Sequence, residues 1–176
     1  IVTGAAGAIG SGICRGLLRS NCRVAVTDLA GERLDSLVRE LVSEFSDSVM
    51  GAAMDVTDPD SVAAAVSTIV DAWGSLDIAI VNAGVAHVSS LKDMDLTAFQ
   101  RLEKINVEGT LLVLKELARH FEAQNTGGDI VLLYGELGAG KTTLTKGIAH
   151  GLSIVHEITS PTFTLVNSHQ GRVRFF

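Results

Sequence analysis

The sequence has 176 residues, a formal net charge of -6 and a hydrophobic content of 47%. Its length is enough for one sizeable core or for a domain plus a fragment, and its charges form no basic cluster that would indicate a nucleic-acid-binding surface. No run of about 20 apolar residues exists to span a membrane. The high hydrophobic content suits the continuous apolar strands of a buried parallel sheet, which favours an α/β fold.

The first residues, Ile1 and Val2, are typical of the end of a strand, and no Met precedes them. The sequence therefore predicts a chain cut at its front. TGAAGAIG follows at residues 3–10 and leads into a helix expected over about 9–20. Gly4, Gly7 and Gly10 remove Cβ atoms where a backbone must turn tightly and approach a pyrophosphate.

A short apolar strand at residues 22–27 ends at Asp28. Asp28 lies 18 positions after Gly10 (28 − 10), close to the spacing of about 20 for the acid that binds the ribose of a dinucleotide. A carboxylate there accepts ribose hydroxyls and repels a 2′-phosphate, which favours NAD over NADP. The alternative is that Asp28 only caps the following helix.

Helices and strands then alternate, which predicts a doubly wound parallel sheet with the strand order 3-2-1-4-5. Asp58 and Pro59 are expected to begin the third helix, and Gly74 to end it. The remaining expected elements are a helix at 32–45, strands at 49–54, 76–81 and 129–134, and a long helix at about 96–124.

Three groups of residues follow the expected strands or interrupt the long helix. Asp55-Val56 follows the third strand, Asn82-Ala83-Gly84 follows the fourth, and Asn106 lies in the middle of the long helix.

A second glycine-rich loop follows the fifth strand and fits G-x-x-x-x-G-K-[ST], the pattern whose backbone N–H groups cradle nucleotide phosphates. Lys141 is expected to neutralise phosphates and Thr142 to offer its hydroxyl to magnesium. A helix at about 141–152 and a hairpin of residues 163–167 and 172–176 are expected after it. The candidate phosphate-binding residues are Gly135, Gly138, Ala139, Gly140, Lys141, Thr142 and Thr143.

Cysteines and histidines show no metal-ligand spacing. Cys14 and Cys22 are predicted to be small buried residues in a reducing, cytoplasmic setting. The histidines are predicted to lie on the surface or in loops; they are His87, His120, His150, His156 and His169.

Residues 1 to about 130 resemble the front of a short-chain dehydrogenase/reductase, on the strength of TGAAGAIG, Asp28, Asp55-Val56, VNAG at 81–84 and Asn106 in INVEGT. The sequence of these residues also resembles the dehydrogenase part of bifunctional sugar-phosphate aldolase/dehydrogenases. The resemblance implies an adenine contact at Asp55 and a catalytic Asn at Asn106. It implies NAD contacts from Thr3, Gly4, Gly7, Ile9, Gly10, Asp28, Asp55, Val56, Asn82, Ala83 and Gly84.

The family's chemistry also needs a Tyr general acid/base with a Lys four residues later. The single tyrosine is Tyr134, and four residues on stands Gly138. Hydride transfer by the usual mechanism is therefore not expected, even if NAD binds.

Residues 129–176 resemble the small P-loop ATPase of the bacterial tRNA threonylcarbamoyladenosine pathway, on LLYGELGAGKTTLTKGIAHGL and ITSPTFTLVN. That resemblance implies ATP with magnesium as a ligand, whereas the acidic magnesium-binding segment of that family does not follow in the sequence. Residues 127–133 fit either family, so they are interpreted as a junction.

The interpretation is a dinucleotide-binding part at residues 1–128 joined to a P-loop fragment at 129–176, with nucleotides as the expected partners. Three functions remain open. The chain is an NAD-binding oxidoreductase fragment without hydride transfer, an ATP-binding P-loop protein of the tRNA-modification pathway, or a chimeric fragment without an evolved function.

Overall fold

The computed structural model describes residues 1–124, 130–133, 146, 169–170 and 174–175. It divides into two compact units, residues 1–134 and 135–176. The second glycine-rich loop at 135–143 and the expected strand at 163–167 lie outside the described residues.

The first unit is built on one parallel sheet, in the predicted order β3-β2-β1-β4-β5. Every neighbouring pair of these strands is parallel, and β4 and β5 are in register from Ile78 opposite Ile130 to Val81 opposite Leu133. The predicted sheet is confirmed. Its strands are β1 (Val2–Thr3), β2 (Val24–Asp28), β3 (Val49–Ala53), β4 (Ile78–Val81) and β5 (Ile130–Leu133).

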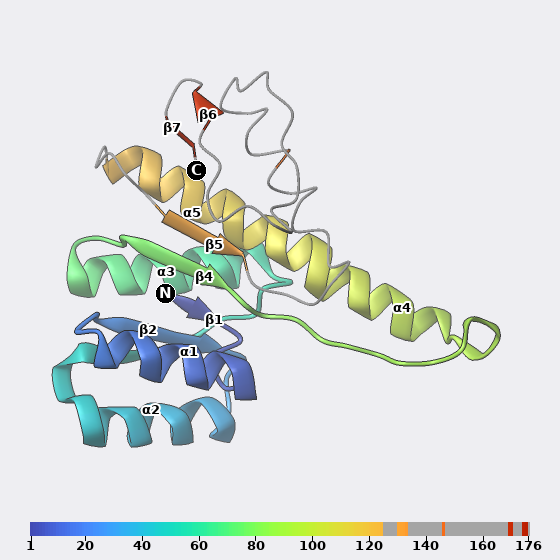
Figure 1. The fold of residues 1–176 in the computed structure, drawn as a ribbon, viewed down its shortest axis with the longest axis horizontal. Coiled ribbons are helices and arrows are strands. Elements are labelled where there is room, and N and C mark those ends of the chain that lie inside the picture. The colour runs from blue at the N-terminus through green and yellow to red at the C-terminus, as the bar shows by residue number, and fades with distance from the viewer. Residues whose placement is uncertain (125–129, 134–145, 147–168, 171–173, 176) are drawn as a thin grey trace. The chain divides into compact units, whose positions relative to one another are not determined.

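Helices cover both faces of this sheet (Figure 1). On one face lie α1 (Ala8–Arg19) and α2 (Glu32–Phe45), and on the other lie α3 (Pro59–Trp73) and α5 (Thr110–Gln124). Between α1, α2 and the sheet, the core is filled by buried aliphatic side chains and the thiol-bearing Cys14. Cys22 packs half-buried against the same cluster.

The third helix begins and ends as its sequence predicts. The Asp58 side chain accepts a hydrogen bond from the Asp60 backbone N–H at 3.0 Å, and Pro59 occupies the first helical position, where no N–H is needed. Gly74 ends the helix with φ 82°, a left-handed conformation that favours glycine.

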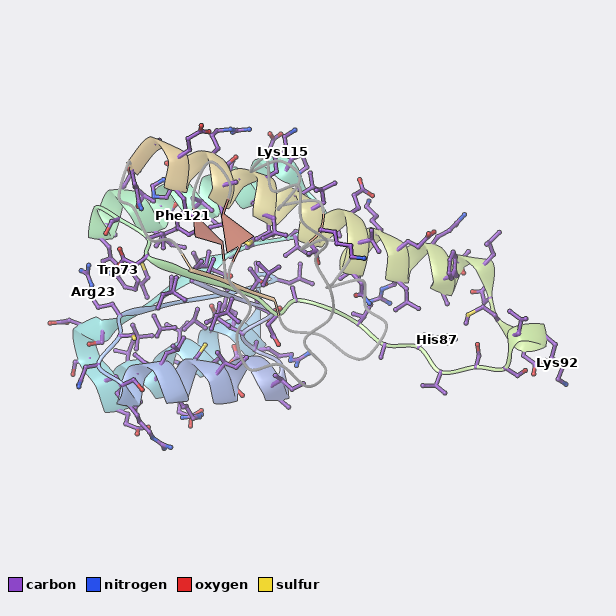
Figure 2. The ribbon with its side chains drawn as sticks, turned by 45° about the horizontal axis from the view of Figure 1, so that its top comes forward. Arg23, Trp73, His87, Lys92, Lys115 and Phe121 are labelled. Carbon is purple, nitrogen blue, oxygen red and sulfur yellow. The ribbon has the colours of Figure 1, made fainter. Side chains whose placement is uncertain are left out.

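The long helix expected at 96–124 is not uniform, which corrects the sequence interpretation. It consists of α4 (Leu96–Glu103), a π-helix at Lys104–Gly109 and α5. The wider π-helical turns change which side chains face the sheet. The spacing of Phe99 and Phe121 along the expected helix predicts that both are packing residues. Phe121 on α5 is buried (Figure 2), but Phe99 on α4 is 42% exposed and is not a core residue.

An arm projects beyond the sheet (Figure 1). We define this arm as residues 85–99, which include a 3-10 turn at Leu91–Asp93 and the start of α4. His87 lies on its extended segment and Lys92 at its tip (Figure 2). His87 is exposed as predicted, whereas His120 on α5 is half-buried and shares a hydrogen bond with Gln124.

A further 3-10 turn, Ser46–Ser48, connects α2 to β3. In the second unit, β6 (His169–Gln170) pairs antiparallel with β7 (Arg174–Phe175). The hairpin expected from 163–167 and 172–176 stays a prediction, because its first strand lies outside the described residues. No helix among the described residues is both long and apolar enough to traverse a bilayer.

Candidate cofactor site at the carboxyl edge of the sheet

A cavity of about 640 Å³ lies where the parallel strands β1, β2, β3 and β4 end. Parallel α/β sheets bind ligands at this edge, outside the carboxyl ends of the strands. The structure brings every residue expected to contact a dinucleotide into the lining of this one cavity. They are Thr3, Gly4, Gly7, Ile9, Gly10, Asp28, Asp55, Val56, Asn82, Ala83 and Gly84.

The glycine-rich loop has the backbone shape that its glycines allow. Gly4 has φ 62°, and a Cβ there would lie 2.7 Å from the Cα of Ala83. Gly7 is the N-cap of α1 and gives the helix no side-chain cap. The first-turn N–H groups of α1 therefore remain available, with the positive end of the helix dipole, for an anion.

Gly10 has the least room for a side chain. A Cβ there would lie 2.3 Å from the Gly4 carbonyl oxygen and 2.7 Å from the Ala5 Cα. This crowding keeps the first turn of α1 directly against the loop. The three glycines thus fit the close backbone approach that a pyrophosphate requires.

Thr3 and Asn82 bind the loops after β1 and β4 to each other. The buried Thr3 hydroxyl oxygen accepts hydrogen bonds from the backbone N–H groups of Asn82 and Ala83, each at 3.0 Å. The Asn82 side-chain amide donates to the carbonyl oxygens of Thr3 at 3.0 Å and Gly4 at 3.2 Å. One wall of the cavity is therefore fixed by hydrogen bonds within the protein.

Asp28 ends β2, half-buried at the cavity, rather than capping α2, which begins after Gly31. Its Oδ2 accepts from the Ala6 N–H and its Oδ1 from the Leu29 N–H, both at 2.8 Å. Arg33 Nη2 donates to the Ala6 carbonyl oxygen at 3.0 Å. Asp28 thus binds the N–H of Ala6 and Arg33 binds its carbonyl oxygen. The Asp28 carboxylate keeps further lone pairs that can accept hydrogen bonds from ribose hydroxyls.

Asp55 and Val56 form the cavity wall after β3. Asp55 Oδ1 accepts hydrogen bonds from the N–H and the hydroxyl of Thr57, at 2.9 and 2.8 Å. Val56 lies against Gly109, where a Cβ would come within 2.8 Å of the Val56 Cγ2. No donor among the described residues binds the second carboxylate oxygen of Asp55, and Val56 offers an apolar surface suited to a base.

Asn106 lies in the π-helix beside the cavity but does not line it. Its Oδ1 accepts from the Val85 N–H at 2.9 Å and its Nδ2 donates to the Val85 carbonyl oxygen at 2.8 Å. Both polar atoms of the side chain are thus bound to one backbone residue. These two hydrogen bonds position the loop after β4. The catalytic role that the resemblance implies for Asn106 stays a prediction.

Among the described residues, three basic side chains that the sequence interpretation did not single out line the cavity. They are Arg33, Arg101 and Lys104. The only sequence signal for them is indirect, because Arg101 and Lys104 stand three positions apart just before Asn106. Among the described residues, no cluster of three or more His, Cys, Asp or Glu could hold a metal ion. Thr142, the expected magnesium ligand, and the other residues of the second glycine-rich loop lie outside those residues.

Comparison with known families gives a match over residues 1–145 to the family described as "short chain dehydrogenase". This match extends past the junction expected at 127–133. A "Sorbitol dehydrogenase" of Cereibacter sphaeroides is 31% identical over 138 residues, which are 78% of this chain and 52% of that protein. A "3-alpha-(or 20-beta)-hydroxysteroid dehydrogenase" of Mycobacterium bovis is 31% identical over 179 residues, covering 95% of this chain and 68% of that protein.

Solved structures share the fold. A 3-ketoacyl-(acyl-carrier-protein) reductase from Brucella melitensis, complexed with NADH, superposes with a TM-score of 0.75 at 24% identity, over 86% of this chain and 69% of that one. A sorbitol-6-phosphate 2-dehydrogenase from Erwinia amylovora gives the same TM-score and identity, over 86% and 65%. The chain spans about half the length of the first curated relatives that it matches.

Proposed function

Because this chain belongs to the short-chain dehydrogenase family, which has an NAD(P)-binding fold, we propose that its cavity binds NAD in preference to NADP. The observation that carries this preference is Asp28 at the end of β2, in the same cavity as the first turn of α1. A carboxylate there accepts the ribose hydroxyls of NAD and repels the 2′-phosphate of NADP. The cofactor would supply the hydride chemistry of the family.

In this proposal, each part of the site binds a different part of the dinucleotide. The first turn of α1 and Gly4, Gly7 and Gly10 receive the pyrophosphate, and Asp28 receives the adenosine ribose. Asp55 and Val56 receive the adenine. The loop of Asn82, Ala83 and Gly84 then borders the nicotinamide half, held in place by Thr3.

We propose that these 176 residues bind the cofactor without turning over a substrate. Asn106 holds a loop, and no Tyr-x-x-x-Lys pair is present in the sequence to move the substrate proton. The substrate of any longer protein is a further proposal. The resemblance to sugar-phosphate aldolase/dehydrogenases favours a sugar derivative, and the two free cysteines favour a reducing, cytoplasmic setting.

The cofactor proposal is tested by titrating NADH and NADPH into the wild-type chain, Asp28→Ala and Asp47→Ala, with calorimetric detection. Asp47 is an exposed carboxylate outside the cavity, so its variant controls for the loss of one charge. We expect Asp28→Ala to weaken NADH by roughly 1.5–3 kcal/mol, as for hydrogen bonds to a charged group, and to reduce discrimination against NADPH. Equal wild-type affinities would refute the NAD preference, and binding of neither would refute the site.

A second candidate function is ATP binding at the glycine-rich loop of residues 135–143. It is favoured by the order of the chain, since this motif follows directly after β5, a parallel strand beside β4. Backbone N–H groups of such a loop, Lys141 and a magnesium ion on Thr142 would bind the phosphates. The junction with a P-loop ATPase of the tRNA threonylcarbamoyladenosine pathway belongs to this proposal.

Lys141→Ala tests ATP binding, and Lys146→Ala is the matched control because it removes an exposed lysine five positions later. We expect magnesium-dependent ATP binding to be lost in Lys141→Ala and kept in Lys146→Ala. If the wild-type chain binds no ATP, this second function is wrong. If it binds neither ATP nor NADH, the chimeric fragment without an evolved function is the better description.

A further inference from the structure

Arg101 and Lys104 are two cations at the cavity that have no ionic partner among the described residues. Both are exposed, and both line the cavity. Within the part of the chain that the structure describes, neither makes an ion pair, whereas Arg15, Arg39 and Arg119 each pair with a glutamate. Their charges are therefore available to a ligand.

The fold directs this pair toward the cavity. Residues three positions apart lie on one side of a helix, so Arg101 and Lys104 share a face. The helix that carries them is fixed at the carboxyl edge of the sheet, because Asn106 binds the Val85 backbone and Gly109 packs on Val56. Both side chains therefore line the same cavity as Asp55 and Asn82, which follow β3 and β4.

The carboxylates of the cavity do not neutralise this pair. Asp28 uses its two oxygens for the backbone N–H groups of Ala6 and Leu29, and Asp55 binds Thr57. Neither lies within ion-pair distance of a cation in the described residues. With Arg33, the described residues that line the cavity include three cations and two carboxylates, in a chain whose net charge is -6.

We propose that Arg101 and Lys104 bind an anionic group, a phosphate or a carboxylate, of the ligand that occupies this cavity. The inference rests on the proposed dinucleotide site and adds a contact to it. A guanidinium offers two parallel donors to such a group and an ammonium adds a point charge. The anion belongs either to the cofactor, as one of its phosphates, or to a substrate bound beside it.

The variants Arg101→Ala, Lys104→Ala and the double variant test the inference, with Lys115→Ala as the control. Lys115 points outward from α5 (Figure 2), is exposed and does not line the cavity. Calorimetry would follow NADH, ADP-ribose and adenosine, and then inorganic phosphate and malonate added to the NADH-saturated protein. Circular dichroism and the melting temperature would establish that each variant is folded.

If the anion is a cofactor phosphate, the double variant weakens NADH and ADP-ribose by about tenfold, as expected for two exposed charge contacts, and leaves adenosine unchanged. If it belongs to a substrate, NADH affinity stays and the double variant loses the binding of phosphate or malonate. Either result supports the inference. Variants that match Lys115→Ala for all of these ligands overturn it, while wild-type NADH binding still decides the cofactor proposal.

Discussion

Asn106 uses both polar atoms of its side chain on the backbone of Val85, and this arrangement determines what its substitution should do. Asn106→Ala leaves a half-buried N–H and carbonyl of Val85 without partners, which we expect to cost roughly 1–3 kcal/mol of unfolding free energy. Amide hydrogen exchange should quicken at Val85 more than in β2. Urea unfolding of Asn106→Ala beside Thr110→Val provides the measurement.

Thr110 is the suitable control for Asn106, because its hydroxyl donates to the Asn106 carbonyl oxygen and does not contact Val85. Thr110→Val should leave exchange at Val85 unchanged. A variant Asn106→Ala with wild-type exchange at Val85 would contradict the positioning role.

The two thiols should differ in reactivity. Burial raises the pKa of the Cys14 thiol to about 11, whereas Cys22 is half-buried. We expect a thiol reagent at pH 8 to modify Cys22 first and Cys14 only as fast as the protein unfolds. Mass spectrometry of Cys14→Ala and Cys22→Ala identifies the site, and rapid modification of Cys14 in the folded protein would contradict its burial.

The raised pKa of Cys14 also predicts that the unfolding free energy falls as the pH becomes alkaline. Folding keeps the proton on Cys14, so this contribution to the unfolding free energy is fully present below the ordinary value of 9.0 and is lost as the pH rises through about 11. Cys14→Ala should remove that part of the alkaline dependence, which urea titrations at pH 8 and pH 11 would measure.

The sequence predicts where the polar residues of this site lie better than it predicts their hydrogen-bond partners. Asp28 and Asn82 follow recognisable strands, so their places at the sheet edge could be predicted. The bonds of Asn82 to Thr3 and Gly4 could not, because they join residues 78 and 79 positions apart. The place of Arg101 and Lys104 in the cavity lining could not be predicted either, because two cations on a helix are typical of a solvated surface.

At the scale of the elements, helix α1 contains two glycines, Gly10 and Gly12, whose substitution by alanine should have opposite effects on stability. A Cβ at Gly10 would overlap the Gly4 carbonyl oxygen and the Ala5 Cα, whereas a Cβ at Gly12 meets nothing within 4 Å. Gly10→Ala should displace the loop, lowering both stability and NADH affinity. Gly12→Ala should raise stability by about 0.5–1 kcal/mol, the difference between Gly and Ala inside a helix.

Thermal unfolding and NADH titration of Gly10→Ala and Gly12→Ala check this pair. Equal effects of the two substitutions would mean that the loop does not depend on close contact with the helix.

Element boundaries were largely predictable because local chemistry determines them, as Asp58, Pro59 and Gly74 do for α3. The π-helix at Lys104–Gly109 was not predictable. Its turns accommodate two distant contacts, Asn106 with Val85 and Gly109 with Val56, and neither contact is visible in a periodicity of apolar residues. Phe99 is exposed because it lies in the arm, beyond the sheet.

At the scale of the whole molecule, the arm carries apolar side chains into solvent. Val88 and Leu91 are 96% and 93% exposed. Apolar patches of this kind favour dye binding and association. We expect Val88→Ser with Leu91→Ser to lower the fluorescence of a bound hydrophobic dye without lowering the melting temperature, since neither side chain is packed. A lower melting temperature would show that these side chains are buried in solution.

The division of the chain into two units makes another prediction at this scale. Among the described residues, those that line the cavity all precede residue 106, within the first unit. A chain of residues 1–134 should therefore fold and bind NADH within about twofold of the full chain, a difference near 0.4 kcal/mol. Calorimetry on both lengths measures this, and a large loss of affinity would place part of the site after residue 134.

The contact between Gly4 and Ala83, with the hydrogen bonds of Thr3 across the same gap, has a kinetic consequence. Two loops that hold each other leave little conformational entropy to be lost when a ligand enters. Association should then proceed in one step, with an observed rate that rises linearly with ligand concentration instead of reaching a plateau. Thr3→Val would remove the acceptor that holds the loops together, and a plateau in stopped-flow traces should then report the slow closing of a wall that the native threonine keeps in place.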